Sequence, residues 1–241
     1  MSVWYCLPSA RPADQAEKVL AMWRERGYKL AVFREMDRGH VEADLLVNTL
    51  PYCGYAVSQN LLIALVLVED SACDWLVAGG DDIHPDPDHS PEEIACQCSD
   101  WFAYRFGVMQ PTGDRWGEEP LHHDPAMRSA YIDRVAGSPW IGREFARRMY
   151  GGRGPYWPEY THMFVDEELR AVALLHGVYW ERRELTHFHD HWGRPRSGER
   201  FGLADRMPEF LRKANSWEEW ERYKALFAER KAAGFPGSEP L

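Results

Sequence analysis

The feature that most constrains the fold is the alternation of short apolar runs with helical periods in the first third of the chain. Residues 3–7 and 29–33 are apolar runs typical of buried strands, and residues 16–23 between them carry apolar side chains at helical spacing. A third strand is expected over residues 44–49. Strand, helix and strand in succession predict a parallel, doubly wound sheet.

The same pattern continues through a buried helix over residues 58–68 and a strand over 75–78. The next helix begins at Ser90, because a capping Ser, a Pro in the first turn and Glu93 form a helix-start signal. Residues 79–89 therefore form a loop between a strand and a helix, and the loop contains four aspartates.

The second half of the chain shows weaker versions of these patterns. Further elements are expected as a strand over residues 106–109, helices over 141–149 and 165–176, a strand over 179–185 and a helix after residue 216. The Gly- and Pro-rich residues 151–158 suit either a mobile lid or a rigid turn. Without repeats or composition breaks, residues 1–241 are expected to form one domain, with a nucleotide-binding half over about 1–105, an acceptor and catalytic half over about 106–200, and a helical tail over about 201–241.

Composition narrows the classes of function. The net charge of −10 disfavours tight nonspecific binding of nucleic acids, and the densest basic patch is formed by Arg143, Arg147, Arg148 and Arg153. Five cysteines without paired CxxC spacing indicate reduced thiols. No signal peptide pattern is visible at the start, and the longest apolar run, residues 61–68, is too short to span a bilayer. We expect a soluble cytoplasmic protein.

Acidic side chains follow the strand at residues 75–78. Asp81, Asp82 and Asp86 lie in the sequence GGDDIHPDP, at the end of the strand where open α/β sheets place their ligands. Carboxylate oxygens in such a group suit Mg²⁺ or Mn²⁺. The alternative is a turn in which the carboxylates accept hydrogen bonds from backbone amides.

Two further clusters carry groups suited to chemistry. His187, His189 and His191 alternate along the chain, so their imidazoles are able to share one face and bind zinc or manganese, or to remain solvated without a ligand. Residues 164–169 begin a helix with three acids. Acids in a first turn commonly complement the helix dipole, and we expect this role for at least one of them, whereas another is able to act as a general base.

The order of these motifs resembles that of the inverting GT-A glycosyltransferases, a large family with many bacterial and phage members. The loop that holds the nucleotide matches residues 7–11, the DxD-like metal motif matches 79–82, the helix start with the base matches 165–169, and the HxH element matches 187–189. The resemblance extends over residues 3–196 and implies a Rossmann-like, mostly parallel sheet flanked by helices. It departs at Gly80, which stands where DxD has its first Asp.

The resemblance implies an inverting transfer from a nucleotide diphosphate sugar, a UDP-sugar first, with Mn²⁺ or Mg²⁺ on the diphosphate. Asp82 and His189 are the first metal ligands it implies, followed by Asp81 and His187, and Asp166 is the base, followed by Glu167. The expected donor site is Pro8, Ser9, Arg11, Arg34, Asn60, Asp81, Arg194 and Arg196, and the expected acceptor site is Gln110, Asp114, Trp116 and Trp157.

The acceptor stays open at this point, and so do two other classes of function. Glycans, proteins and hydroxymethylpyrimidines in phage-type DNA are all acceptors of similar small enzymes. A metal-dependent hydrolase that uses the His and Asp clusters is the first alternative, and a non-catalytic module that binds a nucleotide or sugar is the second.

Overall fold

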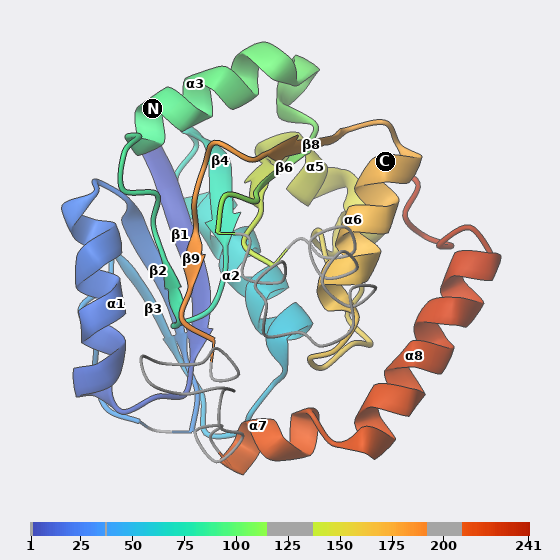
Figure 1. Cartoon of the computed structure of the whole chain (residues 1–241), viewed down its shortest axis with the longest axis horizontal. Coiled ribbons are helices and arrows are strands. Elements are labelled where there is room, and N and C mark those ends of the chain that lie inside the picture. The colour runs from blue at the N-terminus through green and yellow to red at the C-terminus, as the bar shows by residue number, and fades with distance from the viewer. Residues whose placement is uncertain (1, 37, 115–136, 192–208) are drawn as a thin grey trace.

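The computed structural model describes residues 2–36, 38–114, 137–191 and 209–241 of the chain. A seven-stranded sheet in the order β3-β2-β1-β4-β7-β6-β8 lies between layers of helices (Figure 1). Its strands are β1 (Ser2–Ser9), β2 (Lys29–Arg34), β3 (Leu45–Asn48), β4 (Cys73–Ala78), β6 (Val108–Pro111), β7 (Trp140–Gly142) and β8 (Tyr179–Arg182). A separate two-stranded sheet pairs β5 (Ile83–His84) with β9 (Phe188–His189).

The sheet is mostly parallel. Strands β1 to β4 pair in parallel, as do β6 and β8, whereas β7 is antiparallel to both β4 and β6. The longer helices are α1 (Ala13–Glu25), α2 (Tyr55–Glu69), α3 (Pro91–Trp101), α5 (Arg143–Arg148), α6 (Val165–Leu175), α7 (Glu209–Ala214) and α8 (Trp217–Ala232). The expected α/β class with a mostly parallel sheet between helices is confirmed.

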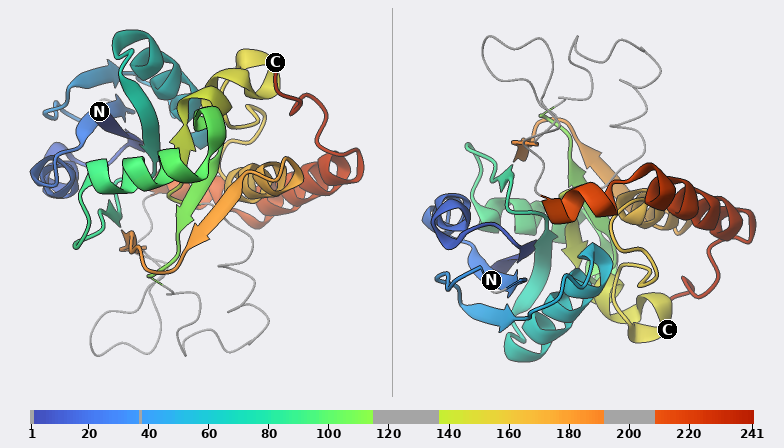
Figure 2. Two further views of the ribbon diagram at one scale, coloured as in Figure 1. Left: turned by 90° about the horizontal axis from the view of Figure 1, so that it is seen from above. Right: turned by 90° about the horizontal axis from the view of Figure 1, so that it is seen from below.

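Alternation along β1 explains why both faces of the sheet are covered. Trp4 and Cys6 pack into one apolar cluster with α2, α5 and α6, and Tyr5 and Leu7 pack into a second cluster with α1 and α3. Figure 2 shows α1 and α2 on opposite sides of the sheet. A strand that is buried on both faces reads as a continuous apolar run, which is the pattern of residues 3–7.

One expected element is wrong in its first part. The helix over residues 141–149 begins as strand β7, and only Arg143–Arg148 is α-helical. Side-chain pattern cannot distinguish a three-residue strand from a helix turn, and the choice is made by the neighbours: Gly142 donates its amide to the Gly107 carbonyl, and a Cβ at Gly142 would collide with the Arg105 carbonyl. By contrast, the helix start at Ser90 is confirmed, with both hydrogen bonds of the capping box to Glu93 present.

The state of the cysteines and the absence of a long apolar helix were also expected from the sequence. All five cysteines are free thiols. In the described ranges, no helix combines the length and the apolar character needed to cross a membrane.

A buried ion pair attaches the C-terminal helix α8 to α6, along whose outer side it runs (Figure 1). The Arg230 Nε and Nη2 atoms donate to the Glu168 carboxylate at 2.6–3.0 Å, and the hydroxyls of Tyr150 and Tyr160 each donate to it at 2.8 Å. Glu168 is 1% exposed and Arg230 is 7% exposed. Glu168 is therefore structural, through a buried ion pair rather than the helix-dipole role that the sequence suggested for these acids.

Removing one side of this pair leaves an unpaired buried charge. We expect Arg230→Met to lower the free energy of unfolding by about 3–5 kcal/mol. Lys224→Met on the same helix is the control, because the Lys224–Glu221 pair is exposed and its loss costs at most about 1 kcal/mol. Urea denaturation of both variants measures the difference, and equal small effects would contradict a structural role for the Glu168 pair.

Candidate active site

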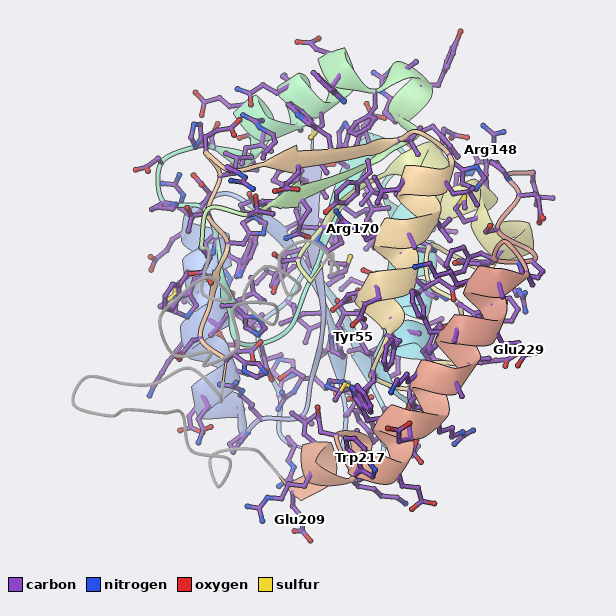
Figure 3. The ribbon with its side chains drawn as sticks, turned by 45° about the vertical axis from the view of Figure 1, so that its right-hand side comes forward. Tyr55, Arg148, Arg170, Glu209, Trp217 and Glu229 are labelled. Atoms are coloured by element: carbon purple, nitrogen blue, oxygen red, sulfur yellow. The ribbon has the colours of Figure 1, made fainter. Side chains whose placement is uncertain are left out.

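A cavity of about 1110 Å³ lies at the carboxyl ends of β1 and β4, where open α/β sheets bind ligands. The segment after β1, the segment after β4 and the helices α7 and α8 form its walls (Figure 3). Its lining includes Ala10, Arg11, Pro12, Arg38, Tyr52, Asp81, Asp82, Thr161, Asp190, Lys213, Arg222 and Tyr223.

Two adjacent carboxylates stand on the cavity wall directly after β4. The backbone before them is fixed, because the Tyr5 hydroxyl donates to the Gly80 carbonyl at 2.6 Å and leaves no room for a side chain at Gly79. Asp81 accepts from the Ser9 hydroxyl at 2.6 Å and from Arg11 Nε at 2.9 Å. Burial raises the pKa of Asp81, and the charge of Arg11 opposes this shift.

Asp82 lies against His189 and, like Asp81, against Arg11. Its Oδ2 lies 3.4 Å from His189 Nε2 and 3.7 Å from Arg11 Nη2. The antiparallel pairing of Ile83 with His189 brings the two segments together, and Asp190 N donates to the Asp82 carbonyl at 2.8 Å. Burial alone would raise the pKa of Asp82, but His189 and Arg11 outweigh burial and hold it well below its usual range.

His187 does not join this pair. It is 3% exposed, its ring packs edge-on against Trp23, and its Nδ1 lies 3.1 Å from the Ser138 hydroxyl. Burial lowers the pKa of His187 to about 4, so the side chain is a neutral imidazole inside the core. The third histidine, His191, does act on Asp82, because its charge helps to lower the Asp82 pKa. The His191 ring centroid is 5.0 Å from that of His189.

Arg34, an expected donor-site residue, is buried beneath the segment that follows β1. It is 1% exposed, and it donates to the Ser9 hydroxyl at 2.8 Å and to the Arg11 carbonyl at 2.9 Å. These hydrogen bonds fix the end of the segment from Pro8 to Arg11. Within that segment, Ala10 and Arg11 line the cavity.

Three other expected ligand contacts are internal supports. Asn60 uses both ends of its amide on the backbone of Tyr156, at 2.7 and 3.1 Å, which favours a rigid turn over a lid for residues 151–158. Gln110 holds the Ser138 backbone amide at 3.2 Å. The Trp157 ring packs against the Arg230 guanidinium at 3.7 Å.

Two other expected site residues, Asp114 and Asp86, accept hydrogen bonds from backbone amides. Asp114 accepts from the His189 backbone amide at 3.1 Å, so it helps to position that histidine. Asp86 accepts from the backbone amides of Asp88, His89 and Thr186 and is therefore a turn residue rather than a partner of Asp81 and Asp82. Trp116, Arg194 and Arg196 lie outside the described residues.

Asp166 stands in the first turn of α6 with an unusual environment for a carboxylate. Its Oδ1 atom is buried without a hydrogen-bond partner among the described residues. Burial raises its pKa well above the usual value, and the neighbouring charge of Glu167 raises it further. A carboxylate that holds its proton more tightly than usual is better matched to proton transfer near neutral pH.

The sequence analysis did not single out some side chains that lie near these groups. His162, in the segment before α6, is close enough to Asp82 to interact with its charge, and burial lowers the His162 pKa. Tyr55 and Gln59 lie on the first turns of α2, where a polar side chain in an otherwise apolar helix was the available signal. Tyr156 carries no comparable local signal.

The residues present suit only part of a metal site. Within the described ranges, no three His, Cys, Asp or Glu side chains are grouped so that they could hold a metal ion. Asp82 and His189, with His191 near, offer one carboxylate and imidazole nitrogens, which are ligands that Mn²⁺ accepts. A cation here would need additional oxygen ligands from a substrate.

The expected basic patch is occupied internally. Arg143 donates to the Leu67 carbonyl near the end of α2 and to the Cys73 carbonyl at the start of β4, and Arg148 donates to the Leu241 carbonyl. Arg147 pairs with Glu144, and Arg153 donates to the Tyr150 carbonyl. The patch therefore supplies no support for a DNA acceptor.

No protein-family model matches the chain, and no curated protein sequence matches it significantly. Among solved structures, it is similar to the catalytic domain of Drosophila β1,4-galactosyltransferase 7 in complex with xylobiose, at 12% identity over 89% of this chain and 79% of that chain, with a TM-score of 0.47. It is also similar to a mutant of the Drosophila enzyme in complex with manganese, UDP-Gal and xylobiose. The identity is 13% over 90% of this chain and 80% of that chain, and the TM-score is 0.46. A third similar structure is a glycosyltransferase involved in glycosylation of the major capsid of PBCV-1. The identity is 10% over 59% of this chain and 60% of that chain, and the TM-score is 0.34.

The buried Asp166 carboxylate predicts a pH-dependent cost to stability. Because its pKa is raised in the folded state, folding is favoured while the group is protonated, and stability is lost as the pH rises through the folded pKa. Asp166→Asn stays neutral, so its melting temperature should exceed that of the wild type by an amount that grows as the pH rises above about 4, the ordinary pKa of an aspartate. Asp100→Asn, at an exposed carboxylate, is the control. A pH-independent difference would refute the buried-carboxylate interpretation.

Proposed function

We propose that the protein is a glycosyltransferase that moves a sugar from a nucleoside diphosphate sugar to an acceptor hydroxyl with inversion. The observation that carries this proposal is the division of labour between two carboxylates. Asp82 is kept charged by His189 and Arg11 on the wall of a large cavity, and Asp166 is buried with a raised pKa. One group suits cation binding and the other suits proton transfer.

The donor diphosphate would lie beside the loop that ends at Arg11. Arg11 faces the cavity, and its guanidinium already neutralises Asp81 and Asp82. Asp82 and His189, with His191 near, are the residues that would hold Mn²⁺ or Mg²⁺, and such a cation supplies Lewis-acid stabilisation of the negative charge on the leaving diphosphate. The cavity is of the size that nucleotide ligands fill.

Asp166 would accept the proton of the attacking hydroxyl. In its deprotonated form the Oδ1 atom has no competing hydrogen bond within the described part of the chain. Direct displacement assisted by one general base inverts the anomeric centre. The acceptor we propose is a glycan hydroxyl, because the net charge of −10 and the internally paired arginines disfavour a nucleic acid.

A thermal-shift screen tests donor binding. We expect at least one of UDP-galactose, UDP-glucose, GDP-mannose and a dTDP-sugar to raise the melting temperature, and the rise to be larger with Mn²⁺. Asp82→Asn should remove the Mn²⁺-dependent part of the shift. Asp74→Asn is the matched control, because Asp74 lies on the same strand at its opposite end. A flat response to every donor would contradict the proposal, and zinc binding without nucleotide binding would favour a metal-dependent hydrolase.

Two variants identify the base. Asp166→Asn should keep donor binding and lose transfer by about 100-fold or more. Glu167→Gln should keep transfer and move the acidic limb of the pH profile of kcat/KM to lower pH, because the Glu167 charge raises the Asp166 pKa. Transfer to xylobiose and other short glycans is the assay. Loss of transfer in Glu167→Gln with retention in Asp166→Asn would reverse the two roles.

A further inference from the structure

The outer side of α2 is apolar and yet exposed. The amino-acid pattern predicts a buried helix over residues 58–68, because apolar residues lie on most of its sides. In the structure, every exposed residue between positions 55 and 68 is apolar, and these residues are Val57, Leu61, Ala64, Leu65 and Val68. Val68 is 85% exposed and Leu61 is 43% exposed. A helix with the composition of a buried one is therefore left uncovered on one side by the described residues.

The five exposed residues form one continuous stripe. Their spacing of three or four residues places them on a single face of the helix, which is 15 residues and therefore about 22 Å long. Figure 2 shows α2 at the outside of the molecule on its side of the sheet. A hollow of about 250 Å³ lies beside the second half of the stripe, between α2 and α5, and its lining includes Ala64, Val68, Ala146 and Arg147. The face thus offers both projecting side chains and a recess.

The charge of this face points to the partner that it fits. The stripe contains no ionisable residue, and the first one along α2 is Glu69 at its end. Arg147, beside the hollow, already pairs with Glu144 at 2.9 Å. The chain carries a net charge of −10, so two copies repel each other wherever charged surfaces meet. An uncharged apolar face is the place where two copies approach without that repulsion.

The order of side chains along the stripe suits pairing with itself. A two-fold axis places the same patch on both copies, so that residue i contacts residue j and residue j contacts residue i. In an antiparallel pair centred between Leu61 and Leu65, Val57 lies opposite Val68 of the second copy. Leu61 then lies opposite Leu65, next to the small side chain of Ala64. Valine meets valine and leucine meets leucine, so the sizes match in both halves of the contact.

We propose that a second copy of the chain covers α2, in an antiparallel pair of the two α2 helices. Exposed apolar patches of a few hundred Å² usually mark an interaction surface. Two such faces, with their flanking residues, bury on the order of 1,000 Å², which is the lower end of the range for specific interfaces. The dimer therefore forms in a concentration-dependent way. This inference does not depend on the proposed function.

Light scattering after gel filtration tests the dimer, because it measures the mass of the protein in solution. At high concentration the wild type should have the mass of two chains. Leu61→Glu should have the mass of one chain at every concentration, because it places a charge inside the apolar contact. The melting temperature of the wild type should rise with protein concentration, and that of Leu61→Glu should not. An unchanged circular dichroism spectrum verifies that the variant is folded.

Leu175→Glu is the matched control, because Leu175 is 59% exposed but lies on α6, and its mass should equal that of the wild type. Leu65→Lys alone should be monomeric. A mixture of Leu65→Lys with Leu61→Glu should form a dimer again, because residue 61 of one copy faces residue 65 of the other.

A wild type with the mass of one chain at every concentration would overturn the proposal, and so would a dimer that persists in Leu61→Glu. A mixture that stays monomeric would refute the antiparallel arrangement. A monomeric wild type that floats with phosphatidylserine vesicles would assign the stripe to a membrane surface instead of a second copy.

Discussion

The candidate site depends on two neighbouring, partly buried carboxylates, Asp81 and Asp82, just after the carboxyl end of β4. Adjacent buried negative charges are unfavourable unless cations or hydrogen-bond donors offset them. Ser9 and Arg11 satisfy Asp81, while His189 and Arg11 satisfy Asp82. Ser9 ends β1 and Arg11 follows it, whereas His189 lies on β9 in the distant second half of the chain. The acidic pair thus draws together segments that the sheet alone would not connect.

The local patterns were sufficient for most of the scaffold. Apolar runs and helical spacing predicted the strands and helices of the first hundred residues, and the capping box at Ser90 fixed the start of α3. They failed at β7, because a three-residue strand is chosen by the backbones of its neighbours and not by its own side chains. The convergence of Asp82 with His189 followed from the placement of both at strand ends.

Individual roles in the site were less predictable, because they depend on contacts between distant residues. Nothing near His187 in the sequence indicates that Ser138 and Trp23 enclose it. Asn60 and Gln110 are polar residues that bind backbone groups of the same chain, and this use is visible only after folding. Likewise, the Asn60 amide fixes the backbone of Tyr156, 96 residues later in the chain, and no local pattern indicates this contact. The sequence therefore indicates Asp82 and Asp166 as candidate groups, whereas the residues that surround them are visible only in the fold.

The central claim is that Asp82 and His189 hold a divalent cation together with a nucleoside diphosphate. Electron paramagnetic resonance measures it directly, because the signal of free Mn²⁺ falls as the ion is bound. With UDP present, the wild type should withdraw Mn²⁺ from solution, and His189→Ala should weaken this binding by more than roughly tenfold, a loss that even an outer-shell partner causes. A signal that the protein leaves unchanged in the presence of UDP, or equal withdrawal by the wild type and the variant, would contradict the account.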